Sequence, residues 1–254
     1  MLSPRLIPCL LIHKGALYKT TYFENPKYIG DPLNAVRLYN DKEVDELIVL
    51  DIDASRYDTE INYKLISKLS IECRMPLCYG GGVKSVEQFE KIVSLGVEKV
   101  AISSAAIKNP SLITEASKRV GKQSVVAVID VKKNYLLKKY DITYINGSKK
   151  SNLDCKEWII KLQELGVGEI IINSVDNDGK MRGYDFEFID SVYPLIKTPL
   201  TVLGGAGSLD HIRKLYSRYQ LIGAAAGSLF VFKGKFRAVL INYPNREEKA
   251  NLLI

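Results

Sequence analysis

The sequence predicts an α/β protein, a (β/α)8 TIM barrel with a twofold half-barrel internal repeat. Two observations lead to this fold class. Short aliphatic segments alternate along the chain with longer amphipathic segments, and the second half of the chain repeats the first at an almost constant offset. The chain has 254 residues, 46% of them hydrophobic, which is enough for one such barrel. We therefore expect one domain over residues 1–254.

Eight segments have the continuous aliphatic character of strands that are buried on both faces of a parallel sheet. They are RLIPCLLI at 5–12, DELIVLDI at 45–52, PLCYG at 76–80, KVAIS at 99–103, SVVAVID at 124–130, EIIINS at 169–174, PLTVLGG at 199–205 and LIGAAA at 221–226. Eight strands with helices between them, in a chain of this length, predict a closed barrel.

Amphipathic segments between the strands predict the helices. In residues 86–95, for example, Phe89, Ile92 and Val93 fall on one helical face. The other clear helical patterns cover 111–120, 156–165 and 209–216. Residues suited to capping a helix N-terminus precede three of these segments, namely Ser85, Asn109-Pro110 and Ser208.

The internal repeat connects residues that lie far apart along the chain. The matching segments are 79–106 with 203–230 at an offset of 124, 44–53 with 167–176 at 123, and 8–14 with 127–133 at 119. Two half-barrels of four βα units each explain these matches. The repeat places Asp53 on Asp176 and Leu11 on Asp130.

Glycine-rich loops follow two of the predicted strands. They are Gly80–Gly82 and Gly204–Gly207, and each is followed one unit later by a serine, at Ser103–Ser104 and Gly227–Ser228. Glycine lets backbone N–H groups approach a phosphate, and the next loop offers a hydroxyl and a helix N-terminus. The glycines could serve only as tight turns. Because the arrangement occurs twice, it favours two anion sites on opposite sides of the mouth, for a substrate with a phosphate at each end.

Carboxylates at strand ends are the next candidates. Asp130 closes a very apolar strand, so desolvation should raise its pKa and suit it to proton transfer. Its repeat partner is Leu11, so a barrel that could carry an acid and base pair carries only one of the two. His13 lies just beyond the first strand and could reach the mouth, where an imidazole suits proton transfer.

Composition excludes several classes of partner. The net charge is +7, but the basic residues are dispersed, so we expect no nucleic acid. No apolar run approaches the roughly 18 residues of a membrane span, and the N-terminal segment lacks a cleavage site, so we expect a cytoplasmic protein without a membrane partner. The two histidines and four cysteines show no ligand spacing, so neither a metal nor a cofactor is expected.

Together these landmarks resemble the cyclase subunit of imidazole glycerol phosphate synthase over essentially the whole chain. The matching motifs are FENPKYIGDP at 23–32, VDELIVLDIDAS at 44–55, GGGVKS at 80–85, NPSLI at 109–113, AVID at 127–130, SVDNDG at 174–179, GGAGS at 204–208 and AAGSLF at 225–230. The resemblance implies a lyase barrel that takes ammonia from a glutaminase subunit docked at its N-terminal face. At the C-terminal mouth, ammonia and a bisphosphorylated ribonucleotide would give imidazole glycerol phosphate and an aminoimidazole carboxamide ribotide, a step of histidine biosynthesis.

The resemblance also implies roles for individual residues. Asp130 matches one of two catalytic aspartates. The matches to substrate and phosphate contacts are Lys19, Gly82, Ser104, Asp178, Gly179, Gly205, Ala226, Gly227 and Ser228. The matches to a charged gate at the ammonia entrance are Arg5, Glu46, Lys99 and Glu169.

One departure from the family pattern separates three hypotheses. The other catalytic aspartate falls on Leu11, and losing a general acid or base costs about 10²–10⁴ in rate. With the gate retained, the chain resembles a paralogous form that is thought to pass ammonia to a sugar amidotransferase, which makes acetamidino groups for lipopolysaccharide. The alternatives are a genuine histidine-pathway cyclase and a different phosphosugar isomerase on the same half-barrel plan. Leu11 counts against both, and the gate residues count against the isomerase.

Overall fold

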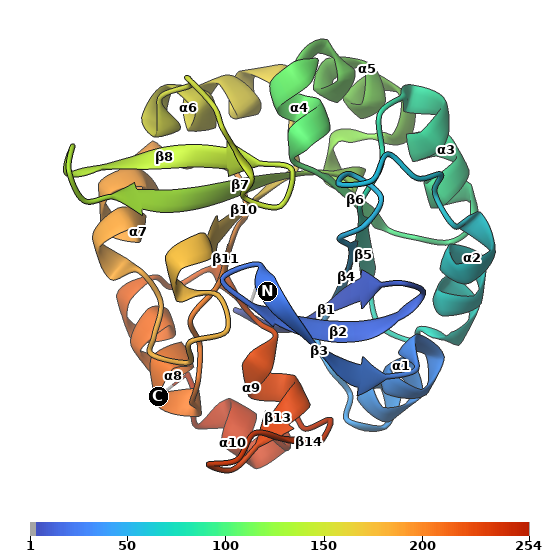
Figure 1. Cartoon of the computed structure of the whole chain (residues 1–254), viewed down its shortest axis with the longest axis vertical. Coiled ribbons are helices and arrows are strands. Elements are labelled where there is room, and N and C mark those ends of the chain that lie inside the picture. The colour runs from blue at the N-terminus through green and yellow to red at the C-terminus, as the bar shows by residue number, and fades with distance from the viewer. Residues whose placement is uncertain (1–3, 254) are drawn as a thin grey trace.

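The computed structural model describes residues 4–253 and shows, within them, a closed barrel of eight parallel strands surrounded by helices (Figure 1). In barrel order the strands are β1 (Arg5–His13), β4 (Leu47–Asp51), β5 (Leu77–Gly80), β6 (Lys99–Ile102), β7 (Val125–Asn134), β10 (Glu169–Ser174), β11 (Leu200–Leu203) and β12 (Ile222–Ala226). The pairing of β12 with β1 closes the ring. The predicted fold class is confirmed. The expectation of one domain stays a prediction, and its residues 1–3 and 254 lie outside the described part.

The strand bounds agree with the predicted ones to within two residues, except that β7 continues to Asn134. The helices are α1 (Pro32–Asp41), α2 (Tyr63–Glu72), α3 (Val86–Ser94), α4 (Ser104–Lys108), α5 (Ser111–Val120), α6 (Cys155–Leu165), α7 (Phe186–Val192), α8 (Leu209–Arg218), α9 (Ser228–Val231) and α10 (Arg246–Ala250). None of the helices within residues 4–253 is both long enough and apolar enough to cross a membrane.

Two of the three predicted caps are confirmed. The side chains of Ser85 and Ser208 accept hydrogen bonds from backbone N–H groups in the first turns of α3 and α8. The cap predicted at Asn109-Pro110 is wrong. Pro110 is the residue before α5 and has no side-chain acceptor, and Asn109 accepts a hydrogen bond from the Ser111 hydroxyl at 2.9 Å instead.

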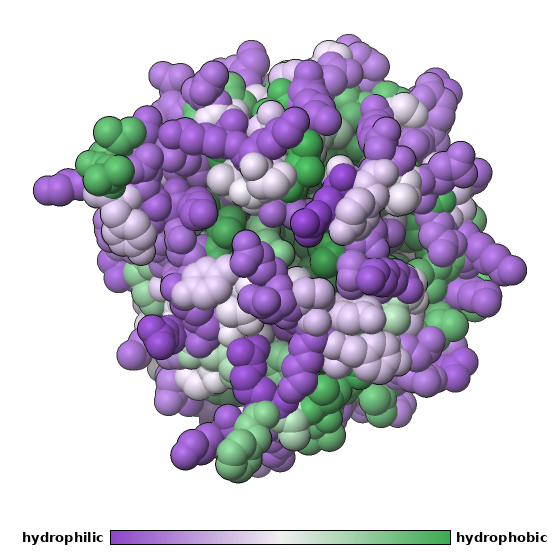
Figure 2. All heavy atoms as spheres, viewed as in Figure 1, coloured by the Kyte–Doolittle hydropathy of each residue, from purple (hydrophilic) through white to green (hydrophobic). Residues whose placement is uncertain are grey.

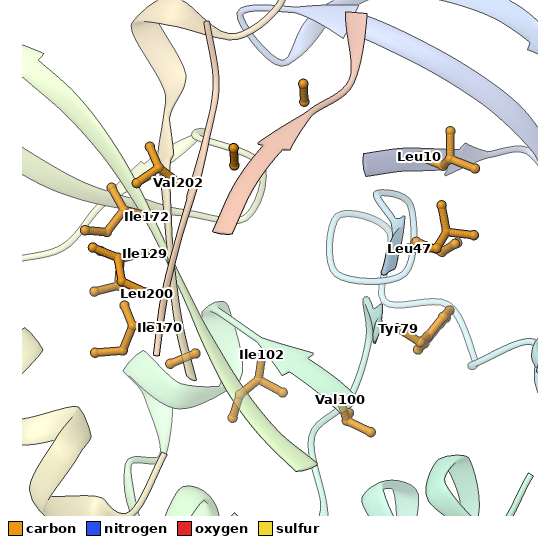
Figure 3. Packing of buried hydrophobic residues seen from close by; sticks show 14 of the residues in the cluster. Leu10, Leu47, Tyr79, Val100, Ile102, Ile129, Ile170, Ile172, Leu200 and Val202 are labelled. Atoms are coloured by element: carbon orange, nitrogen blue, oxygen red, sulfur yellow. The ribbon is translucent and has the colours of Figure 1, made fainter. Parts of the chain in front are cut away.

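The strands divide their side chains between two apolar layers because successive residues point to opposite faces. In β10, Ile170 and Ile172 join the large layer between the strands and the helices, whereas Ile171 joins the smaller layer inside the barrel. Figure 3 shows the outer layer, with side chains such as Leu10 and Val202 on the outer side of their strands. The interior is therefore a packed apolar core that separates the two ends of the barrel.

Two antiparallel hairpins that were not predicted extend from the barrel strands at twofold-related places. β1 continues into β2 (Ala16–Thr21) and β3 (Glu24–Gly30), and β7 continues into β8 (Lys139–Tyr144) and β9 (Lys149–Lys150). Figure 1 shows both hairpins on the same side of the ring, and Figure 2 shows that hydrophilic residues cover most of this face. The first two hairpins extend from equivalent strands of the two half-barrels, so the internal repeat is also visible in three dimensions. A third hairpin, β13 (Phe232–Lys233) with β14 (Ala238–Val239), follows α9.

Candidate functional site

A pocket opens at the carboxyl ends of the barrel strands. Its floor is made by side chains of the inner apolar layer, among them Cys9, Val128 and Leu203. Most of the residues expected to contact substrate line it, namely Lys19, Asp130, Asp178, Gly179, Gly205, Ala226, Gly227 and Ser228. Gly82 and Ser104 line a second pocket, which shares Ser55, Gly81 and Ala101 with the first. The predicted mouth residues are therefore brought together in two adjoining pockets.

Asp130 is a buried acid in the main pocket and is only 9% exposed. Burial raises its pKa from 3.8 to about 6, although hydrogen bonds from the Asn173 amide at 2.9 Å and the Ser103 hydroxyl at 3.5 Å favour the charged form. A pKa this close to neutrality lets one carboxyl both accept and donate a proton at physiological pH. The rise expected from the apolar strand is therefore found.

The position that the repeat pairs with Asp130 contributes only an apolar side chain. Leu11 lies on β1 and lines the same pocket. Asp51 is a second acid on this side, and burial raises its pKa too. However, Asp51 accepts hydrogen bonds from the backbone N–H groups of Asp53 and Ala54 and so stabilises the loop after β4. The position that the repeat pairs with Asp130 thus has no carboxyl group that could transfer a proton.

Lys19 and Asp178 form a buried ion pair between the first hairpin and the loop after β10. Lys19 Nζ lies 2.6 Å from Asp178 Oδ1, and the Thr20 hydroxyl donates to Asp178 Oδ2 at 3.1 Å. The lysine side chain crosses Gly227, where a Cβ would stand 2.7 Å from Lys19 Cε. A side chain at 227 would therefore displace the lysine from its present path.

The glycine loops have the backbone geometry that anion binding requires. Gly82 and Gly205 have φ of +75° and +110°, and a Cβ on Gly205 would lie 2.0 Å from the Gly183 carbonyl oxygen. The Ser104 hydroxyl oxygen accepts the Ile145 backbone N–H at 3.0 Å, so its own proton stays available to a ligand. Both loops can present backbone N–H groups to a phosphate.

Four charged side chains close the opposite end of the barrel. Arg5 contacts Glu46 and lies 2.7 Å from Glu169, and Lys99 lies 2.8 Å from each of the two glutamates. Glu46 and Glu169 are both 3% exposed, and they occupy equivalent positions of the repeat, 123 residues apart. The structure thus brings the four predicted gate residues into one closed ring of alternating charge.

The gate charges stabilise one another despite their burial. Burial alone would raise the pKa of Glu169, but Arg5 and Lys99 outweigh it and lower that pKa to about 2. The same contacts raise the pKa of Lys99 and of Arg5 although burial acts in the other direction. Arg5, Lys99 and Glu169 are therefore charged at neutral pH.

The inner apolar layer lies between the gate and the mouth. Its buried members are Ile7, Cys9, Ile48, Cys78, Ala101, Val126, Val128, Ile171, Leu203 and Ala225. An ion that entered this layer would lose its hydration without a partner, at a cost of several kcal/mol. The sequence of gate, apolar layer and polar pocket suits the passage of a small uncharged molecule.

Two polar residues within the barrel strands belong to the site and were not predicted. Asn173 donates to Asp130, and the buried Thr201 donates to Glu169 at 2.5 Å within the gate. Both lie inside aliphatic strands, EIIINS and PLTVLGG, at positions that face the barrel interior. A polar residue in an otherwise apolar strand was the available signal for them.

We expect Asp130→Asn to be more stable than the native chain at pH 7, by about 2 kcal/mol. The folded state holds the Asp130 proton more tightly than the unfolded chain, since its pKa is about 6 against an ordinary 3.8. This carboxyl therefore lowers the free energy of unfolding as pH rises from about 4 to about 6, and an amide does not. Urea unfolding of both proteins between pH 4 and 8 measures the difference. A gap that does not grow with pH would contradict the assignment.

Within residues 4–253, no group of three or more histidine, cysteine or acidic side chains is arranged to hold a metal ion.

The histidine biosynthesis protein family matches residues 5–237. A Vibrio vulnificus (strain YJ016) protein named "Putative imidazole glycerol phosphate synthase subunit hisF3" is 54% identical over 253 residues, 100% of this chain and 97% of that protein. "Putative imidazole glycerol phosphate synthase subunit HisF" of Leptospira borgpetersenii is 53% identical over 252 residues, 99% of each chain. "Imidazole glycerol phosphate synthase subunit HisF" of Alkaliphilus metalliredigens (strain QYMF) is 37% identical over 230 residues, 91% of each chain.

Proposed function

Because the chain belongs to the histidine biosynthesis protein family and is a HisF-type subunit, we propose that it receives ammonia from a glutaminase and delivers it through the barrel to the mouth. Its role would be the paralogous one, the supply of ammonia for acetamidino sugars of surface polysaccharides. One observation carries this proposal. The gate is complete at one end of the barrel, whereas Leu11 leaves Asp130 without its partner carboxylate at the other.

The gate supports ammonia transfer because it is a costly feature. Two buried carboxylates with two partly buried cations are rarely favourable compared with apolar packing, so a purely structural plug would not need charges. The ring also lies at the N-terminal end of the strands, where a glutaminase would dock. Ammonia that enters there meets the apolar inner layer and then the main pocket.

The mouth supports a weakened ring-forming activity rather than a full one. Lys19, Asp178 and the two glycine loops are arranged to hold a phosphorylated ligand. Asp130 offers one proton-transfer group, and leucine at position 11 offers none. The reaction on the usual ribonucleotide should therefore be slower by about 10²–10⁴.

The alternative is a genuine histidine-pathway cyclase that forms imidazole glycerol phosphate. It is favoured by Asp130, whose pKa near 6 suits acid–base catalysis. The chain is, however, 54% identical to the protein named hisF3 and 53% identical to the Leptospira borgpetersenii protein, both of which carry the word "Putative" in their names, and 37% identical to the Alkaliphilus protein, whose name lacks that word. This difference supports the paralogous role.

Each end of the barrel would have its own partner. A glutaminase of the HisH type would bind at the gate end and form a heterodimer with this chain. A sugar amidotransferase would take ammonia at the mouth. The phosphorylated ligand of the mouth would be a small molecule with an anionic group at each end.

Glutamine hydrolysis in a mixture with the glutaminase tests the proposal. We expect a HisH-type glutaminase to bind the purified chain and to hydrolyse glutamine at least about 10-fold faster in the complex, because the partner orders its active site. Size-exclusion chromatography measures binding, and glutamate formation measures the rate. A glutaminase that neither binds nor responds would overturn the proposed transfer.

A further inference from the structure

His13 forms a pair with Asp53 at the rim of the mouth, outside the site described so far. Its Nδ1 lies 2.6 Å from Asp53 Oδ1, and the other carboxylate oxygen accepts the Lys14 backbone N–H at 2.7 Å. His13 is the last residue of β1, and the next residues turn into the hairpin β2–β3. The pair therefore ties the root of this hairpin to the loop after β4.

The imidazole also packs along the hairpin itself. The His13 ring meets the Tyr18 ring edge-on at 4.9 Å, and Tyr18 meets Tyr28 in the same way at 5.5 Å. Tyr18 lies on β2 and Tyr28 opposite it on β3. The three rings thus connect Asp53 with both strands of the hairpin.

The tip of the hairpin is strained. Tyr22, Phe23 and Asn25 all have left-handed backbone conformations, with φ of +56°, +62° and +51°. A left-handed backbone is unfavourable for residues other than glycine, so the tip keeps this shape only while contacts hold it. Asp178 supplies them, since its carbonyl oxygen accepts the Tyr22 N–H at 3.1 Å and its carboxylate accepts the Phe23 N–H at 3.3 Å.

The other half-barrel provides an internal comparison. Asp176, the repeat partner of Asp53, accepts the Lys133 backbone N–H at 2.6 Å, just as Asp53 accepts that of Lys14. The position equivalent to His13 is Lys132, which is exposed. The carboxylate contact with the strand is therefore common to both halves, and the imidazole is an addition in the half that carries Lys19.

We propose that His13 is a positioning residue for Lys19. Held by Asp53, its ring anchors the root of the hairpin β2–β3, so that the strained tip stays on Asp178 and Lys19 stays at the mouth. The inference rests on the proposed function only in treating Lys19 as a contact of the phosphorylated ligand.

Hydrogen exchange of residues 16–30 tests the anchor. We expect these amides to exchange about 10-fold faster in His13→Leu than in the native chain, since a hydrogen bond to a charged group and a ring contact are lost together. His13→Gln keeps an N–H donor for Asp53, and His13→Phe keeps a ring for Tyr18, so each should show a smaller increase. Lys132→Leu is the matched control and should leave residues 16–30 unchanged.

Two exchange results would overturn the proposal. One is unchanged exchange of residues 16–30 in His13→Leu. The other is an equal increase over the barrel strands β10 and β11, which would mean a general loss of stability instead of a released hairpin.

Calorimetric binding of the family's bisphosphorylated ribonucleotide tests the effect on Lys19. We expect an affinity about 10-fold lower in His13→Leu and unchanged in Lys132→Leu. Faster exchange with unchanged affinity would overturn the positioning role. If the native chain does not bind the ribonucleotide, the proposed ligand of the mouth is wrong, and hydrogen exchange still decides whether His13 anchors the hairpin.

Discussion

Leu11→Asp is expected to raise ammonia-dependent formation of imidazole glycerol phosphate by about 10²-fold or more. The substitution places a carboxylate on β1 at the position that the repeat pairs with Asp130, within the pocket that both residues line. The Lys19–Asp178 pair and both glycine loops are already in place, so one proton-transfer group is the main element missing. Initial rates with the ribonucleotide and saturating ammonium salt measure the gain.

The matched controls separate the charge from the change of shape. Leu11→Asn has nearly the same size as Leu11→Asp but cannot exchange a proton at neutral pH, so it should show no gain. Leu11→Asp combined with Asp130→Asn should lose the gain again. No increase with Leu11→Asp itself would mean that the pocket has diverged in shape as well as in its acid–base groups.

Glu169→Ala is expected to lower the free energy of unfolding by about 3–5 kcal/mol. The substitution removes the carboxylate that contacts both cations of the gate, so Arg5 and Lys99 would keep only Glu46 between them. It also leaves the buried Thr201 hydroxyl without its acceptor. Urea unfolding at pH 7 measures the loss, and Glu164→Ala, which removes an exposed partner of Lys161, should change stability little. Equal effects of the two variants would contradict the gate as described.

The fall of the free energy of unfolding at acid pH should depend on the same carboxylate. Because the pKa of Glu169 is about 2 in the folded chain and 4.5 ordinarily, its stabilising effect is present above pH 4.5 and is lost as pH falls toward 2. Glu169→Gln should therefore show a flatter decline between pH 4.5 and 2 than the native chain. An unchanged slope in that window would assign acid sensitivity to other groups.

The barrel was predictable because its signals are local and repeated. Each barrel strand is an aliphatic run bounded by polar residues. The second half-barrel repeats the first, so the order of the βα units can be read from the sequence. The Asn109-Pro110 cap failed because capping depends on side-chain direction, which residue type alone does not determine. The hairpin strand β3 was missed because its residues are mostly exposed and carry no aliphatic pattern.

Some residues of the candidate site could be predicted from local sequence, whereas others could not. Asp130 and the glycine loops stand at strand ends, so the sequence alone predicts that they lie at the mouth. The gate residues lie 41 to 164 positions apart in their contacts, and no short-range pattern joins Arg5 to Glu169. The resemblance indicated them, and the barrel closure between β12 and β1 explains how they meet. The pair of His13 with Asp53 likewise needs the parallel pairing of β1 with β4 to become visible.

The central claim is that this barrel transfers ammonia but closes the imidazole ring poorly. Its most direct test incubates the purified chain with the ribonucleotide and saturating ammonium salt and follows imidazole glycerol phosphate, beside a histidine-pathway cyclase with both aspartates. We expect a rate at least about 100-fold below that control, because Leu11 cannot exchange a proton. A rate close to the control would contradict the claim and identify the chain as a histidine-pathway cyclase.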